Sequence, residues 1–151
     1  MVAGKKKSNL PPIKALVVDD EKPITDLLCM LLRNIGVEPI CAYDGETAYE
    51  IFRKEKPDII FSDYVMPGLD GVALYKKIRA QKPETPFVLF TGFFDKLIVR
   101  FMEESTETGD GSLLFEEPDF VMRKPFMKSE DIIEILEKVF PDRQFNAPED
   151  D

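Results

Sequence analysis

Five polar residues of the chain each follow a short apolar segment. They are Asp19, Asp20, Asp63, Thr91 and Lys124. Three converging carboxylates need a cation, because two of them about 4 Å apart repel by ~4 kcal/mol at an effective dielectric near 20. An all-oxygen site suits Mg²⁺ better than a transition metal, and the chain has no histidine to bind zinc. If the fold brings these residues together, they indicate a magnesium site.

Each residue of this set also has a plainer structural interpretation. Asp19 and Asp20 precede an expected helix, where acidic side chains commonly cap and complement the helix N-terminus. Asp63 can form a turn, Thr91 can cap a helix, and Lys124 can be a solvated surface lysine. Only their joint appearance at one edge of a sheet favours chemistry over these alternatives.

The apolar segments before these residues are typical of buried β-strands. They are short, rich in β-branched residues and apolar nearly throughout, as in a sheet covered on both faces. Strands are predicted at residues 13–18, 37–43, 58–62, 86–90 and 120–122. Apolar residues at helical spacing predict helices at residues 23–35, 46–54, 71–80, about 93–103 and 129–140, the last capped by Ser129.

The alternation of these elements predicts a five-stranded, parallel, doubly wound α/β sheet flanked by five helices. In such sheets functional groups collect at the carboxyl ends of the strands, near the point where the strand order reverses. That rule places the five polar residues at one edge of the sheet.

Length and charge narrow the class of protein. The 151 residues fit one domain, and the net charge of −9 argues against direct binding to nucleic acid. No apolar run is long enough to span a membrane and no signal peptide opens the chain, so we expect a cytoplasmic protein without membrane contact. Cys29 and Cys41 are expected to be buried free thiols in a reducing compartment, in preference to a disulfide.

Composition divides the chain into three parts. Residues 1–12 are expected to be a flexible leader and residues 141–151 an acidic, loose tail. Between them, residues 13–140 form the domain, with an extended polar loop at about 103–118. No residues remain for a second domain, which is expected of a stand-alone domain or of a fragment of a larger protein.

The spaced motifs resemble those of one family. Residues 17–21 read VVDDE, residues 63–71 read DYVMPGLDG, Thr91 is followed by Gly92, and residues 124–126 read KPF. Over about residues 13–140 the chain resembles the CheY-like receiver domain of the two-component response regulators. The resemblance implies a flavodoxin-like sheet with strand order 2-1-3-4-5.

The resemblance also implies a role for each site residue. Asp63 is implied to accept a phosphoryl group from a histidine kinase or a histidine phosphotransfer protein. Asp20 and Asp63 are implied to bind Mg²⁺ directly, Asp19 mainly through water, and Val65 through its backbone carbonyl.

Two further residues are implied to contact the phosphoryl group itself, Lys124 by pairing with one oxygen and Thr91 by donating its hydroxyl to another. The chain is then a phosphoprotein of a phosphorelay that signals through protein–protein contacts, not an enzyme. Its downstream partner is unknown, and a homodimer is compatible with the family.

Three features depart from the family pattern. The aromatic residue that usually stands three positions before the lysine is replaced by Val121, so either a bulge brings Phe120 into its place or the aromatic switch is missing. The interval between Thr91 and Lys124 is longer than usual, with the excess at about residues 103–118. Val65 and Phe93 are apolar where a side chain could orient an attacking water, which predicts slow self-dephosphorylation.

Three alternative functions make other demands on the sequence. A pseudo-receiver would act as a binding or dimerisation module without phosphorylation. A haloacid-dehalogenase-type phosphatase would need a second aspartate at the position of Val65. A nucleotide-binding protein would carry a glycine-rich loop after the first strand, where this chain has carboxylates.

Overall fold

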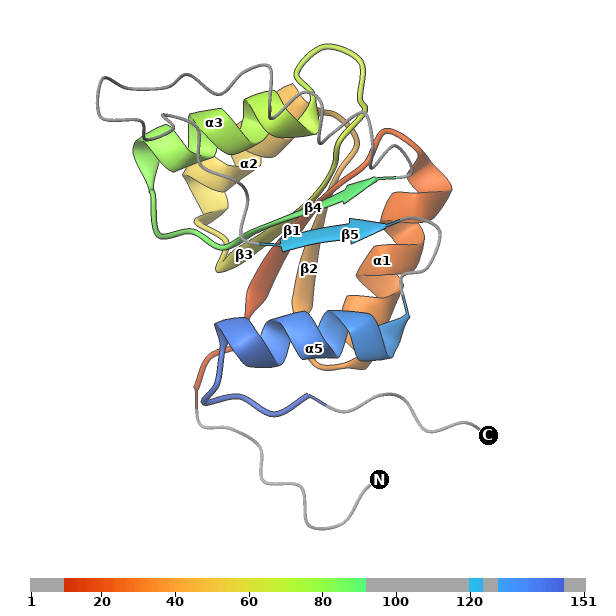
Figure 1. The fold of residues 1–151 in the computed structure, drawn as a ribbon, viewed down its shortest axis with the longest axis vertical. Coiled ribbons are helices and arrows are strands. Elements are labelled where there is room, and N and C mark those ends of the chain that lie inside the picture. The colour runs from red at the N-terminus through yellow and green to blue at the C-terminus, as the bar shows by residue number, and fades with distance from the viewer. Residues whose placement is uncertain (1–9, 92–119, 124–127, 146–151) are drawn as a thin grey trace, which may run out of the picture.

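The computed structural model describes residues 10–91, 120–123 and 128–145. Within them the chain forms a parallel sheet with helices on both faces (Figure 1). The strands pair in the order β2-β1-β3-β4-β5, and their bounds are β1 (Lys14–Val18), β2 (Glu38–Ala42), β3 (Ile59–Asp63), β4 (Phe87–Thr91) and β5 (Phe120–Arg123). The helices are α1 (Lys22–Asn34), α2 (Gly45–Glu55), α3 (Gly71–Gln81) and α5 (Ser129–Val139).

The flavodoxin-like α/β class predicted from the sequence is confirmed. The strands and helices that the structure describes begin and end within one or two residues of the predicted positions. The helix expected at about 93–103 and the loop expected at 103–118 lie outside the described residues. The full number of helices therefore stays a prediction, as do the flexible leader and the loose tail.

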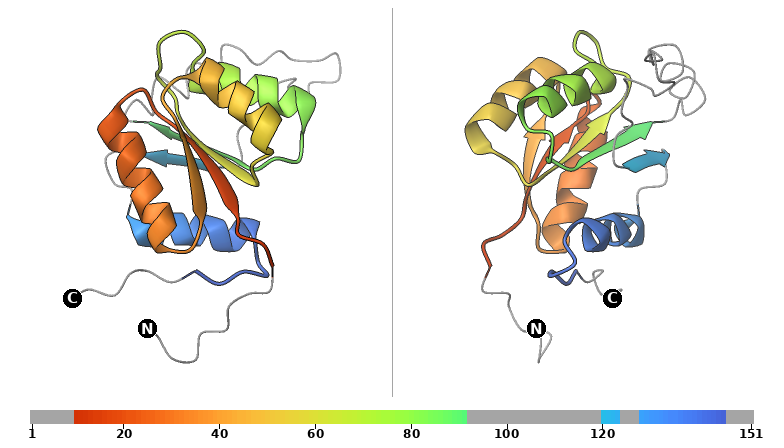
Figure 2. Two further views of the ribbon diagram at one scale, coloured as in Figure 1. Left: turned by 180° about the vertical axis from the view of Figure 1, so that it is seen from behind. Right: turned by 60° about the vertical axis from the view of Figure 1, so that its left-hand side comes forward.

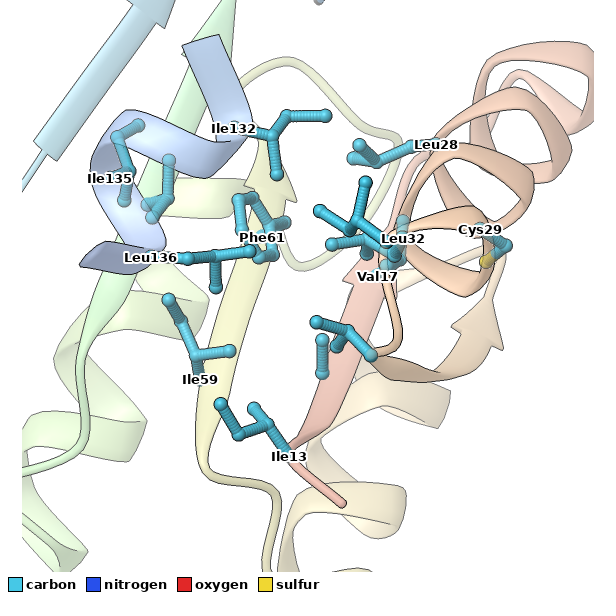
Figure 3. Packing of buried hydrophobic residues seen from close by; sticks show 14 of the residues in the cluster. Ile13, Val17, Leu28, Cys29, Leu32, Ile59, Phe61, Ile132, Ile135 and Leu136 are labelled. Atoms are coloured by element: carbon cyan, nitrogen blue, oxygen red, sulfur yellow. The ribbon is translucent and has the colours of Figure 1, made fainter. Parts of the chain in front are cut away.

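Two apolar layers hold the helices against the sheet. One layer lies between the sheet and the pair α1 and α5, and Figure 3 shows it packing around Val17, Phe61 and Leu136. The other layer lies between the sheet and the pair α2 and α3, which run side by side over the opposite face (Figures 1 and 2). Because consecutive strand residues point to opposite faces, strands that are apolar throughout supply both layers.

Aspartate side chains cap the starts of α2 and α3. Asp44 accepts a hydrogen bond from the Thr47 amide at 2.7 Å, and Asp70 accepts one from the Ala73 amide at 2.9 Å. Ser129, predicted to cap the last helix, is instead its first helical residue. The Asp131 carboxylate accepts the Lys128 amide at 3.4 Å, so the acidic first turn satisfies that backbone donor.

The prediction for the cysteines is wrong. Cys29 of α1 and Cys41 of β2 form a disulfide across a Cα–Cα distance of 6.8 Å. The two residues are twelve positions apart in the chain, and each reads on its own as a buried apolar thiol. The sequence pattern could not show that the packing of α1 on β2 brings them together. The cysteines therefore do not support a reducing compartment.

Among the described residues no helix has both the length and the apolar character that crossing a bilayer requires.

Two neighbouring leucines of α1 test the layer beneath that helix. Leu28 is fully buried, whereas Leu27 is 43% exposed. We expect Leu28→Ala to lower the free energy of unfolding by about 2–5 kcal/mol, because it leaves a cavity. Leu27→Ala is the matched control and should cost less than ~1 kcal/mol. Urea denaturation measures both, and equal losses would contradict the packing described.

Candidate functional site

The strand register brings the ends of β1, β3 and β4 to one edge of the sheet. Val18 pairs with Ser62, and Asp63 pairs with Phe90. Asp19 follows Val18 directly, so it lies beside the end of β3 where Asp63 is carried. Asp19, Asp20 and Asp63 each offer a carboxylate oxygen within 4.8 Å of the other two. The convergence that the sequence predicted for these three residues is present.

The three carboxylates differ in burial. Asp19 is 0% exposed and Asp63 5% exposed, while Asp20 lies open to solvent. Buried carboxylates are costly unless positive charge or hydrogen bonds compensate them. At 4.8 Å two such charges repel by ~3 kcal/mol at an effective dielectric near 20, less where solvent screens Asp20. The cluster therefore favours a cation, and its oxygen donors fit Mg²⁺.

Backbone contacts fix Asp19 at the start of α1. Its carboxylate accepts a hydrogen bond from the Glu21 amide at 2.9 Å. Its carbonyl accepts the hydroxyl of Thr25 at 2.7 Å, and Thr25 is itself fully buried. Sequence reasoning missed Thr25, although a hydroxyl on the buried side of an amphipathic helix was a usable signal.

The backbone that follows Asp63 is held by the neighbouring strand and helix. The Tyr64 amide donates to the Phe90 carbonyl at 3.0 Å, and the Gly71 amide donates to the Tyr64 carbonyl at 2.9 Å. A Cβ on Gly71 would overlap the Asp63 carbonyl oxygen and lie 2.7 Å from Leu89 Cδ1. Glycine at the start of α3 therefore lets the helix approach the strand end that carries Asp63.

The turn after β3 is held by a glycine and by a carboxylate of α2. Gly68 has φ +73°, which favours glycine, and the Glu46 carboxylate of α2 accepts the Leu69 amide at 3.0 Å. Met66 is buried, whereas the Val65 side chain is 48% exposed. The role implied for the Val65 carbonyl as a metal ligand stays a prediction.

Of the two residues implied to contact a phosphoryl group, the structure describes only one. Thr91 is the last residue of β4, 1% exposed, and follows the residue that pairs with Asp63. It therefore lies at the same edge as the carboxylates. Lys124 lies outside the described residues, so its implied pairing with the phosphoryl group stays a prediction.

The pairing of β4 with β5 bears on the missing switch aromatic. Phe120, Val121 and Met122 pair in unbroken succession with Val88, Leu89 and Phe90, so no bulge shifts this stretch of β5. Phe120 packs against the layer under α1 and α5. The bulge that would have brought Phe120 into the usual aromatic position is absent from Phe120–Arg123.

A family comparison agrees with this geometry. The family model described as response regulator receiver domain matches residues 15–107. That range contains the three carboxylates and Thr91.

Several solved structures are similar to this chain over most of their own length. The receiver domain of NtrX from Brucella abortus is 28% identical, with a TM-score of 0.67 and coverage of 85% of this chain and 99% of that one. The chemotaxis protein CheY4 from Vibrio cholerae is 25% identical, with a TM-score of 0.68 and coverage of 85% and 99%. A receiver domain protein from Clostridium thermocellum, 24% identical with coverage of 86% and 95%, shares the fold at a TM-score of 0.70.

Gly71→Ala tests the close approach at Asp63. Alanine in place of glycine usually stabilises a helix, by up to ~1 kcal/mol. Here we expect a loss of about 1–3 kcal/mol, because the new methyl group overlaps the Asp63 carbonyl and crowds Leu89. Ala80→Gly, at an exposed position of the same helix, reports the propensity effect alone. A more stable Gly71→Ala protein in urea denaturation would contradict the contact.

Proposed function

Because the chain belongs to the response regulator receiver domain family, we propose that it accepts a phosphoryl group on Asp63 in a Mg²⁺-dependent manner. One observation carries the proposal: Asp63 ends the central strand β3 with its carboxylate beside those of Asp19 and Asp20. A strand end gives the nucleophile a rigid mount, and the turn at 66–68 keeps the approach to it open.

In this proposal a carboxylate oxygen of Asp63 attacks the phosphorus of a phosphohistidine. The bond between phosphorus and the histidine nitrogen breaks, the imidazole keeps the electron pair, and an acyl phosphate forms on Asp63. The donor is a histidine kinase or a histidine phosphotransfer protein, since the chain has no histidine of its own. The domain is a phosphoacceptor in a phosphorelay and not an enzyme with turnover on a small substrate.

Asp20 and Asp63 would hold Mg²⁺ directly, with Asp19 acting mainly through water and Val65 through its carbonyl. The ion supplies positive charge against the three carboxylates and the transferring phosphoryl group. The buried Thr91 hydroxyl donates to one phosphoryl oxygen and Lys124 pairs with another. Val65 is apolar and cannot orient a water for attack, so loss of the phosphoryl group is slow.

The proposed output is a protein–protein contact in the cytoplasm. The continuous β5 register and Val121 mean that the output does not depend on an aromatic side chain at the usual position. Neither direct nucleic-acid binding nor membrane binding is part of the proposal, given the net charge of −9.

Phosphorylation of Asp63 is testable by intact mass. With Mg²⁺ and acetyl phosphate we expect the wild type and Asp142→Asn to gain one phosphoryl mass, because Asp142 is not part of the carboxylate cluster. Asp63→Asn should gain none, and chelation of Mg²⁺ should prevent the gain in the other two proteins. If Asp63→Asn gained the phosphoryl group in equal yield, the acceptor would be another residue. Failure of the wild type to gain an adduct from any donor, including a kinase, would refute the proposal.

The cation requirement is testable by stability. Without Mg²⁺ we expect Asp20→Asn to melt at a higher temperature than the wild type, because one of three repelling charges is gone. With Mg²⁺ the wild type should gain stability through binding, and the variant should gain far less. The difference in melting temperature between the two should therefore shrink or change sign. Asp142→Asn is the charge-matched control. A variant stabilised by Mg²⁺ as much as the wild type would contradict the assignment.

A further inference from the structure

A basic groove lies at the end of the α2–α3 layer opposite the carboxylates. It is formed where α2 and α3 end, before β3 and β4 begin, and so lies at the amino-terminal edge of the sheet. Its volume is about 430 Å³, within the range of small-molecule sites. It is lined by Phe52, Arg53, Lys56, Gln81, Lys82 and Glu84.

The groove is positive in a protein that is strongly negative. Three cations and one carboxylate line it, a formal charge of +2 (three minus one), against −9 for the whole chain. Within the described residues, Lys56, Lys82 and Glu84 form no ion pair. Arg53 Nη1 lies 4.0 Å from Glu50 Oε1. Because this ion pair is exposed, it offsets the charge of Arg53 only weakly. The positive charge is thus available to a ligand.

Both walls of the groove are fixed by the backbone. Lys56 ends α2 in the left-handed region at φ +48°, a conformation that costs a lysine ~1 kcal/mol, and its amide donates to the Phe52 carbonyl at 3.1 Å. On the other wall the Arg79 guanidinium donates to the carbonyls of Pro83 and Thr85. The backbone that carries the lining side chains is therefore in place before any ligand arrives, which lowers the entropic cost of binding.

One buried polar group close to the groove, outside its lining, lacks a hydrogen bond. Thr85, next to Glu84, is 3% exposed, and its hydroxyl is the buried side-chain polar atom that has no partner among the described residues. Such atoms are uncommon in folded proteins and call for a partner such as a water or a ligand.

We propose that this groove binds a small phosphorylated molecule. A phosphomonoester carries −1.5 to −2 charges near neutral pH, which matches the +2 of the lining, whereas one carboxylate carries only −1. The Arg53 guanidinium can bind two phosphoryl oxygens, and the two lysines supply point charges. Gln81 and Glu84 can accept hydrogen bonds from hydroxyl groups on the rest of the molecule.

The site is separate from the phosphoacceptor and does not depend on it. The test therefore uses the full chain in buffer with a chelator and no Mg²⁺, where the three carboxylates repel anions. The probe is ribose 5-phosphate, titrated against the backbone amide signals in NMR. We expect saturable shifts in residues 53–56 and 81–84, with a Kd of about 1 mM or tighter.

Charge-matched variants separate the groove from general attraction of anions. Lys56→Gln with Lys82→Gln should weaken binding by at least ~tenfold, because both uncompensated cations are lost. Lys54→Gln with Lys138→Gln removes the same charge from exposed positions outside the lining and should leave the Kd within about twofold. Both pairs change exposed side chains, so the fold is retained.

Several outcomes would overturn the proposal. They are no saturable shift with ribose 5-phosphate, equal weakening by the two variant pairs, and binding of unphosphorylated ribose as tight as that of the phosphate. Citrate that binds as well as ribose 5-phosphate would show a site for anions in general. A phosphoserine peptide more than ~tenfold tighter would assign the groove to a protein partner instead.

Discussion

Mutual repulsion of three carboxylates is the constraint around which this edge of the molecule is built. Asp19 and Asp63 are almost fully buried, and Asp20 beside them is open to solvent. Apolar packing does not weaken this repulsion, but it can hold the strand ends in place in spite of it. The two apolar layers on the faces of the sheet hold the ends of β1 and β3 together against this cost. A cation then has a site whose geometry is already formed.

The same edge is reinforced by contacts whose residues have no chemistry of their own. Thr25 holds the carbonyl of Asp19, and Gly71 allows α3 to begin against the carbonyl of Asp63. Glu46 reaches from α2 to the turn that follows β3. Reactive groups thus sit on strand ends, while the adjoining helices and turn set their position. This division explains how a small domain can hold buried carboxylates in fixed positions at one edge of its sheet.

Much of this was predictable because the informative signals were local. The apolar segments that end at Asp19, Asp63 and Thr91 predicted the strands. Because functional groups of a parallel sheet collect at the carboxyl ends of its strands, these segments also predicted that the three residues share one edge. The disulfide between Cys29 and Cys41 was not predictable, since it depends on how α1 packs on β2. The basic groove was missed for a similar reason: it joins the ends of two helices whose lining residues lie far apart in sequence. Lys124 and the segment 92–119 stay as predicted from the sequence alone.

We propose that cations bind at the carboxylate edge and at no other acidic part of the chain. Mn²⁺ can replace Mg²⁺ to locate the site, because this paramagnetic ion broadens only the NMR signals of nuclei near where it binds. We expect sub-stoichiometric Mn²⁺ to broaden the amide signals of Asp19, Asp20 and Asp63–Val65 first, and excess Mg²⁺ to restore them. Broadening that begins instead at residues 149–151 of the acidic tail, or that Mg²⁺ does not reverse, would contradict this assignment.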